Sequence, residues 1–215
     1  MKDPTTYEHV NPELVGNNRK ILVSNQAGKS NLLSRLESIG MEINSDDKRI
    51  NKLLETVKEK EFQGYSYDGA GASFEILAKN VLDQVPTFFS VESYEVTISG
   101  SKDNSSLSKA NISINVDDRI INSLGEGNGP VNALDNALRK DLGIYNEYIQ
   151  DLILVDYKVR ILDGGTEAIT RVVIESSDSK NQSWFTVGIS PNIIEASFEA
   201  LMDSINYKLI KSNIK

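Results

Sequence analysis

Gly125-Glu126-Gly127-Asn128-Gly129-Pro130-Val131-Asn132-Ala133-Leu134 is a glycine-rich segment that runs directly into a predicted helix. Glycine lets a backbone approach its neighbours closely, and Pro130 suits a first helical turn because its missing N–H needs no partner there. We expect Gly143 to cap the end of this helix. A helix N-terminus can bind a carboxylate or a phosphate, but glycines also allow tight helix packing, so the segment alone leaves both interpretations open.

The composition is that of an ordinary globular protein. Of the 215 residues, 39% are hydrophobic and 25% are charged, and 31 acidic against 23 basic residues give a net charge of -8. This negative charge disfavours binding to nucleic acid or to anionic lipid. No apolar run is long enough to cross a bilayer and no signal peptide opens the chain, so we expect a cytoplasmic protein with no membrane partner.

The residues that usually carry catalysis are scarce. The sequence has no cysteine and one histidine, His9, which argues against thiolate chemistry, a histidine-based triad and a histidine metal site. Residues 25–30 end like a phosphate-binding loop but lack its first glycine. We therefore expect no metal or cofactor in this chain and no complete catalytic apparatus.

The first 85 residues read as a small, mostly helical unit. A short strand is predicted at 19–23, and apolar residues recur at helical spacing in 31–39, from 46 through Val57, and in 72–82. Pro86 follows the last of these helices. We predict a linker subdomain over residues 1–85.

Strands dominate after Pro86, and the pattern occurs twice. The predicted strands are 88–98, 107–116, 152–162, 168–174 and 184–189. The first two precede the glycine-rich segment and its helix, and the others precede a last helix at about 193–205. Two repeats of strands followed by a helix predict an α+β domain over residues 86–215, in which sheets pack against helices. Each repeat exposes a sheet face that a second subunit could cover, so we expect a dimer.

Three separated motifs resemble one protein family. They are the segment 125–134, Leu154-Val155-Asp156-Tyr157-Lys158-Val159-Arg160-Ile161, and Val187-Gly188-Ile189-Ser190-Pro191-Asn192-Ile193-Ile194-Glu195-Ala196-Ser197. Together they are similar to the C-terminal regulatory domain of the 2-isopropylmalate synthase and citramalate synthase family. Residues 163–168 resemble the citramalate synthases more closely. Residues 7–16 are similar to the linker subdomain that follows the catalytic barrel in these enzymes.

The resemblance implies the regulatory region of an acyltransferase. The intact enzymes condense acetyl-CoA with a 2-oxo acid, which is pyruvate in the citramalate synthases, using a divalent metal held in a TIM barrel. This sequence contains no barrel-length run of alternating strands and helices. We therefore expect no condensation by this chain alone. The resemblance makes Tyr7 an accessory catalytic residue, and only where the barrel is present.

The resemblance also implies an effector site between the two subunits of a homodimer. Family members bind the end product of their pathway, which is leucine in the isopropylmalate synthases and isoleucine in many citramalate synthases. Carried over to this sequence, the effector-binding residues are Gly127, Gly129, Asn132, Leu154, Tyr157, Ile161, Ala168, Thr170, Pro191 and Asn192.

These residue types suit a branched amino acid. Leu154, Tyr157 and Ile161 can surround an aliphatic side chain, which gains about 0.8 kcal/mol per buried methylene. The two predicted helix N-termini can accept its carboxylate. Asn132 stands where some relatives carry an acid, so its contact with the ammonium group would lack charge assistance. The bulk of Ile161 favours isoleucine.

Other interpretations stay open. Leu154, Tyr157 and Ile161 are also typical of ordinary strand packing. The effector could be leucine, the chain could be a dimerisation module that binds no effector, or the glycine-rich segment could cradle the phosphate of a nucleotide or of CoA.

Overall fold

The computed structural model describes residues 14, 28–82, 85–100, 106–162, 165, 168–212 and 214. The helices in this part of the chain are α1 (Lys29–Ser38), α2 (Lys48–Phe62), α3 (Gly71–Val81), α4 (Pro130–Lys140), α5 (Asn146–Ile149) and α6 (Ile193–Lys211), with a 3₁₀ turn η3 (Gly143–Tyr145). The strands are β1 (Ser90–Gly100), β2 (Ser106–Val116), β3 (Arg119–Gly127), β4 (Ile153–Ile161), β5 (Thr170–Ser177) and β6 (Ser183–Ser190).

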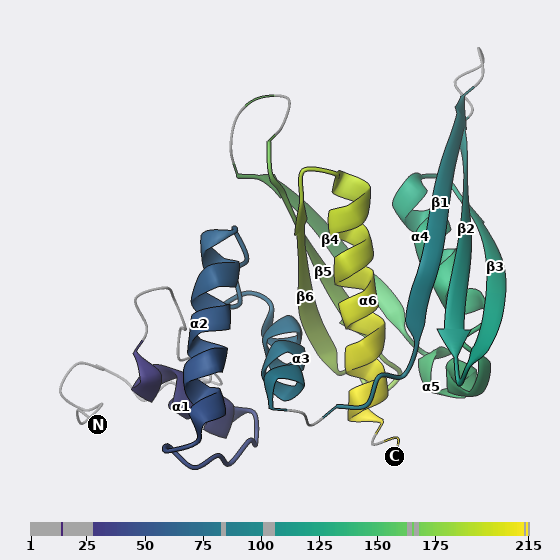
Figure 1. Cartoon of the computed structure of the whole chain (residues 1–215). Helices are drawn as coiled ribbons and strands as arrows, with labels where there is room; N and C mark the ends of the chain where they lie inside the picture. The colour runs from purple at the N-terminus through teal and green to yellow at the C-terminus, as the bar shows by residue number, and fades with distance from the viewer. Residues whose placement is uncertain are drawn as a thin grey trace.

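Two antiparallel three-stranded sheets and their helices form three groups of elements. Sheet A has the order β1-β2-β3 and sheet B the order β4-β5-β6. Helices α1 to α3, which we call the helical unit, lie at one end of the molecule (Figure 1). Sheet B with α6 lies in the middle, and sheet A with α4 lies at the other end. The predicted α+β class is confirmed.

The helical unit closes around its own apolar cluster. Leu32, Ile50, Leu53 and Phe74 are fully buried in it, which explains why apolar residues recur at helical spacing in this part of the sequence. The predicted helices match α1, α2 and α3 to within a few residues. The strand predicted at 19–23 lies outside the described residues.

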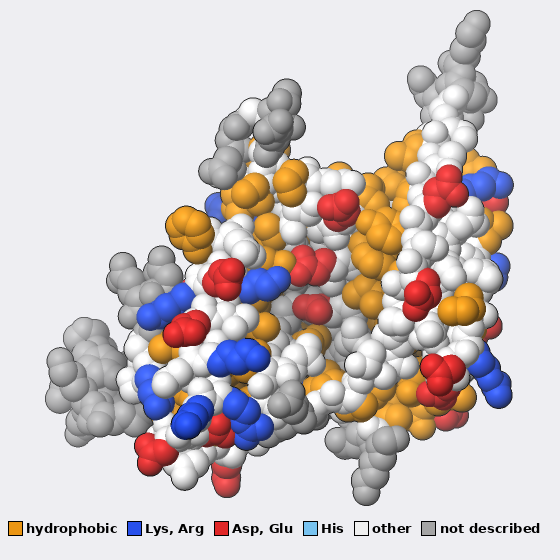
Figure 2. Space-filling model, in the orientation of Figure 1, with side chains coloured by type: hydrophobic (Ala, Val, Ile, Leu, Met, Phe, Trp, Pro, Cys, Tyr) orange, Lys and Arg blue, Asp and Glu red, His pale blue; other side chains and the backbone are white. Residues whose placement is uncertain are grey.

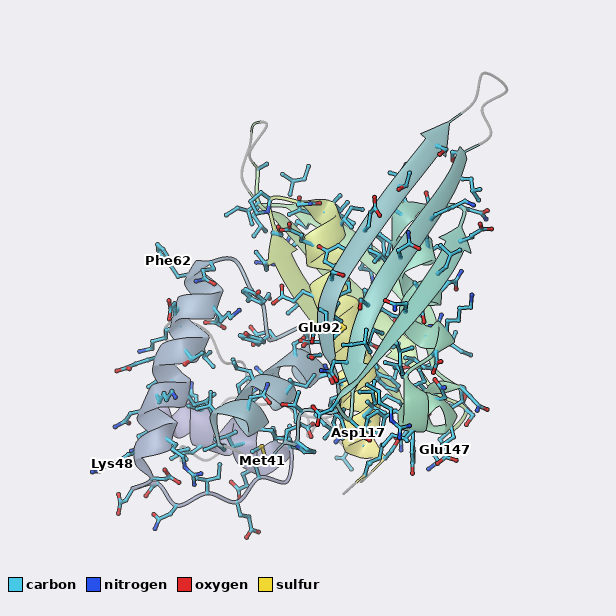
Figure 3. All side chains as sticks on the ribbon, turned by 45° about the vertical axis from the view of Figure 1, so that its right-hand side comes forward. Met41, Lys48, Phe62, Glu92, Asp117 and Glu147 are labelled. Atoms are coloured by element: carbon cyan, nitrogen blue, oxygen red, sulfur yellow. The ribbon has the colours of Figure 1, made fainter. Side chains whose placement is uncertain are left out.

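The glycine-rich segment differs from the prediction in one respect. Gly125 and Gly127 belong to β3, a strand that was not predicted, whereas the helix begins at Pro130 as expected. Strand β3 follows β2 through a tight turn at Asp117 and Asp118, both of which have positive φ. Figure 3 shows Asp117 at the same end of the molecule as Glu147 of α5.

The expected C-cap of the first long helix is also wrong. Helix α4 ends at Lys140, and its C-cap is Asp141 in an extended conformation. Gly143, with φ +59°, instead begins the 3₁₀ turn η3. Asp141 accepts hydrogen bonds from the Gly143 N–H and the Asn146 side chain, so a local side-chain network stops the helix.

The two repeats match each other closely. We call β1-β2-β3-α4 the first repeat and β4-β5-β6-α6 the second; equivalent residues are 63 positions apart in the first strand, the last strand and the helix, and 62 apart in the middle strand. Tyr94 pairs with Ile112 as Tyr157 pairs with Ile174. Both edge strands carry a bulge at the same place, at Glu92 in β1 and at Val155 in β4. The predicted duplication of strands followed by a helix is confirmed.

Each helix lies unusually close to the last strand of its repeat. A Cβ on Gly125 would fall 2.3 Å from the carbonyl oxygen of Ala133 in α4. A Cβ on Gly188 would fall 1.9 Å from the carbonyl oxygen of Ala196 in α6. Glycine at these two positions is therefore required by packing of helix on sheet.

A single apolar cluster runs through both repeats, because buried residues of both sheets, α4 and α6 contact one another. The outer face of sheet B, which points away from α6, is covered by the helical unit: Val187 of β6 is buried in its cluster. Arg171 also donates from Nε to the carbonyl oxygen of Gly64 at 2.6 Å. The helical unit and the second repeat are thus packed together. Among the described helices, none has both the length and the apolar character needed to cross a bilayer.

Candidate functional site

A cavity of about 570 Å³ lies where the two repeats meet, between α4 and the start of β4. Helix α4 presents one face to it, because positions three and four apart lie on the same side of a helix. Its lining residues are Val131, Asn132, Asp135, Arg139, Leu152, Ile153, Leu154 and Tyr157.

The cavity contains three of the predicted effector residues. Leu154 and Tyr157 pair with the buried Ser176 and Ile174 of β5, so both lie on the face of sheet B that α6 covers. The Tyr157 hydroxyl lies 2.7 Å from the Ser197 hydroxyl of α6, which fixes the ring as a wall of the cavity. Asn132 lines the cavity from the first turn of α4.

Two predicted glycines lie at the start of α4, beside the cavity. A Cβ on Gly127 would lie 2.4 Å from Oδ1 of Asn132, so the strand approaches this side chain as only glycine permits. Gly129 is the N-cap of α4, and among the described residues no side chain caps this helix. The N–H groups of its first turn, where Asn132 lies, are therefore available to an anionic group.

The remaining predicted residues lie outside this cavity, at the far end of sheet B. Ile161 pairs with the buried Thr170, which pairs in turn with Ser190. Asn192 is exposed, and its side chain accepts a hydrogen bond from the Ile194 N–H at 2.9 Å as the N-cap of α6. Ala168 precedes β5 and Pro191 precedes α6, so they belong to this end as well. Tyr7 lies outside the described residues.

The edge strands expose apolar side chains. Val159 and Ile161 of β4 lie on the same face as Tyr157 and are 43% and 66% exposed. Ile98, the equivalent of Ile161 on β1, is 60% exposed. Figure 2 shows hydrophobic side chains gathered between α6 and β1. Exposed apolar residues in such number favour contact with another surface.

Two charged residues of the cavity were not predicted. Asp135 is buried and forms an ion pair with Arg139, which also donates to the carbonyl oxygen of Leu152 at 2.6 Å. Burial raises the pKa of Asp135, and the Arg139 guanidinium opposes this shift. The spacing of 132, 135 and 139 on one helix face is the signal that could have found them. Within the described residues no group of three or more His, Cys, Asp or Glu side chains could hold a metal ion.

Comparison with known proteins identifies the family of the domain that carries this cavity. Residues 68–209 match the LeuA allosteric (dimerisation) domain. The chain belongs to the LeuA allosteric (dimerisation) domain family. The whole cavity and both repeats, apart from the last two residues of α6, lie within the matched residues. Residues 1–64 match a second family, the homocitrate synthase post-HMGL domain-like family.

The most similar relatives reported are all (R)-citramalate synthases. That of Geobacter sulfurreducens is 46% identical over 215 residues, which cover 99% of this chain and 40% of the relative. That of Aquifex aeolicus is 46% identical over 214 residues, which cover 98% of this chain and 40% of the relative. That of Synechocystis sp. is 43% identical over 215 residues, which cover 97% of this chain and 39% of the relative. The chain thus spans about 40% of the length of the curated relatives it matches, and the resemblance to this enzyme family is confirmed.

Proposed function

We propose that this chain is the feedback-regulatory and dimerisation region of a citramalate synthase, and that it binds isoleucine. The observation that carries the proposal is the cavity between α4 and β4, which lies inside a domain of an allosteric family. In the whole enzyme, a TIM barrel with a divalent metal would condense acetyl-CoA with pyruvate in the cytoplasm. Residues 1–85 would be its linker subdomain and residues 86–215 its regulatory domain.

The cavity offers the two surfaces that an aliphatic amino acid needs. Val131, Leu152 and Leu154 supply apolar walls. Transfer of the side chain out of water gains about 0.8 kcal/mol per methylene. The first turn of α4, which carries Asn132, supplies N–H groups for a carboxylate.

A second copy of the chain is the partner that suits the exposed edge strands. Val159 and Ile161 continue the face of β4 that begins in the cavity with Tyr157. A symmetric dimer that buries this face would also cover the end of sheet B where Thr170, Pro191 and Asn192 lie. We propose that these predicted residues form the part of the effector site that the second copy closes.

The packing of the three groups of elements supports a route for inhibition. The helical unit is fixed to the second repeat: Ser73 of α3 donates to Asp203 of α6 at 2.5 Å and accepts from the Val187 N–H at 3.0 Å. The cavity instead lies between the repeats. An effector that draws α4 toward β4 would favour one arrangement of the repeats, and the helical unit would pass this preference to the barrel.

Titration of the purified chain by calorimetry tests this proposal. We expect saturable binding of isoleucine, weaker binding of leucine, and a dimer by light scattering. Tighter leucine binding would indicate a leucine-inhibited 2-isopropylmalate synthase instead. A dimer that gives no heat and no thermal shift with either amino acid would leave a purely structural dimerisation module and would contradict the proposal.

The variant Ile161→Ala tests the part of the site outside the cavity. We expect isoleucine to bind about tenfold more weakly, because truncating the side chain removes apolar contact worth roughly 1 to 2 kcal/mol. The matched control is Ile98→Ala, since Ile98 holds the equivalent position on β1 with nearly the same exposure. Unchanged isoleucine affinity in a folded Ile161→Ala variant would remove this residue from the site.

A further inference from the structure

We infer that Asn128 is a site of spontaneous chemical modification, in which the backbone nitrogen of Gly129 attacks the Asn128 side-chain amide. Hydrolysis then leaves an aspartate or an isoaspartate immediately before α4. Asn128-Gly129 is the one Asn-Gly pair in the sequence. It lies in the short bend between the end of β3 at Gly127 and the start of α4 at Pro130. The modification itself needs no ligand, and only its effect on binding rests on the proposed function.

The reaction requires only water as co-reactant. Loss of a proton from the Gly129 N–H to hydroxide gives a nucleophilic nitrogen, which forms a bond to Cγ of Asn128. The bond from Cγ to the side-chain nitrogen breaks, and that nitrogen takes up a proton and leaves as ammonia. Water then opens the resulting five-membered succinimide. Opening at the side-chain carbonyl gives aspartate, and opening at the main-chain carbonyl gives isoaspartate, in which the main chain runs through the former side chain.

Three features of the structure leave this pair open to the reaction. Asn128 is exposed, so water and hydroxide reach its side-chain amide. Within the described residues neither this amide nor the Gly129 N–H forms a hydrogen bond, so no such contact has to break before the two groups meet. Gly129 has no Cβ to hinder approach to its nitrogen, and no described atom lies within 4 Å of the place that a Cβ would occupy.

Packing does not require glycine at position 129, in contrast to the neighbouring glycines. A Cβ on Gly125 or on Gly127 would fall 2.3 Å or 2.4 Å from an atom of α4. Gly129 itself has φ −156° and ψ 165°, an extended conformation that any residue adopts. The variant Gly129→Ala is therefore compatible with the fold, and it hinders the reaction without removing Asn128.

Either product places a negative charge before the first turn of α4. A carboxylate there interacts favourably with the helix dipole, so an aspartate should not destabilise α4. An isoaspartate also lengthens the main chain by one carbon between β3 and α4, which pack closely at Gly125 and Gly127. The new charge repels a second carboxylate at the first turn of α4, where we place the carboxylate of the effector. Modification of Asn128 should therefore lower the affinity for isoleucine.

Incubation of the purified chain in mildly alkaline buffer, followed by peptide mapping with mass spectrometry, tests the inference. Trypsin releases residues 120–139 as one peptide, and exchange of an amide nitrogen for oxygen raises its mass. Fragmentation then assigns the change to one residue. We expect Asn128 to change faster than Asn122, which is also exposed but lies within β3, where pairing with β2 restrains the backbone. The rate should rise with pH, because the attacking nitrogen must lose its proton.

Variants separate the modification from its consequence. Gly129→Ala should fold and lose the Asn128 amide more slowly than the wild type; should it fail to fold, the comparison with Asn122 decides. Asn128→Asp supplies the charge directly and should bind isoleucine roughly twofold to fivefold more weakly, with the neutral Asn128→Gln as its control.

Equal rates in the wild type and in folded Gly129→Ala, or a change at Asn122 as fast as at Asn128, would overturn the inference while the proposed function stands. Equal isoleucine affinity in Asn128→Asp and Asn128→Gln would overturn the effect on binding. A wild-type chain that binds neither isoleucine nor leucine would contradict the proposed function, and the rate at Asn128 would still decide the modification.

Discussion

The variant Gly188→Ala is expected to lose about 3 kcal/mol of stability or more, the upper end of what overpacking costs. Its Cβ would lie 1.9 Å from the carbonyl oxygen of Ala196 and 3.0 Å from the Ala200 nitrogen. Both are backbone atoms of α6 and cannot rotate away. The helix must therefore move off β6, which disturbs the contact of α6 with the buried Val172 and Ile174.

Thermal unfolding followed by circular dichroism measures this effect, and we expect the Tm to fall by roughly 6 °C or more for a chain of this length. Gly71→Ala is the control: a Cβ at Gly71, the first residue of α3, meets no described atom within 4 Å. That variant should melt at the wild-type temperature or slightly above it. If Gly188→Ala melted with the wild type, the close approach of α6 to β6 would be wrong.

The variant Asp203→Asn is expected to change how stability depends on pH. Burial raises the pKa of Asp203 to about 7; the Ser73 hydroxyl lowers it, neighbouring Glu199 raises it and Lys60 of α2 lowers it. The unfolded carboxyl has a pKa of about 3.9, so between about pH 4 and pH 7 the native state holds a proton that the unfolded state has lost. Wild-type stability should therefore fall as pH rises through this window and level off above about pH 7.

The neutral amide removes this contribution. We expect Asp203→Asn to be more stable than the wild type at about pH 8 by on the order of 2 to 4 kcal/mol, and to differ little at about pH 4. Urea unfolding at the two pH values measures the difference. Glu61→Gln is a second variant to measure, because burial also raises the pKa of Glu61 to about 7. Each variant should remove only part of the decrease in wild-type stability between about pH 4 and about pH 7. A wild-type chain whose stability rises between pH 4 and pH 7 would contradict both assignments.

The sequence patterns were sufficient for the helices and for the duplication. Apolar residues at helical spacing reflect burial on one face, as at Leu32, Ile50 and Leu53, and this is a local property that can be read without the fold. Strand β3 was missed because Gly125 and Gly127 are typical of a loop. Glycine is needed at these positions because α4 packs closely against β3. This is a tertiary contact, which the local sequence pattern does not show.

The candidate site was also only partly predictable from the sequence. Asn132, Leu154 and Tyr157 lie together as the family resemblance implied. Asp135 and Arg139 were missed because an acid and a base four apart on a helix are typical of a solvated surface pair. What distinguishes them is the direction in which α4 faces, toward β4, and this is set by the packing of one repeat against the other.

The crystal structure of the chain grown with isoleucine tests the central claim most directly, since it locates the ligand independently of any variant. We expect one isoleucine in the cavity between α4 and β4, with its side chain against Leu154 and its carboxylate at the first turn of α4. Isoleucine bound elsewhere, or an empty cavity at saturating isoleucine, would contradict it.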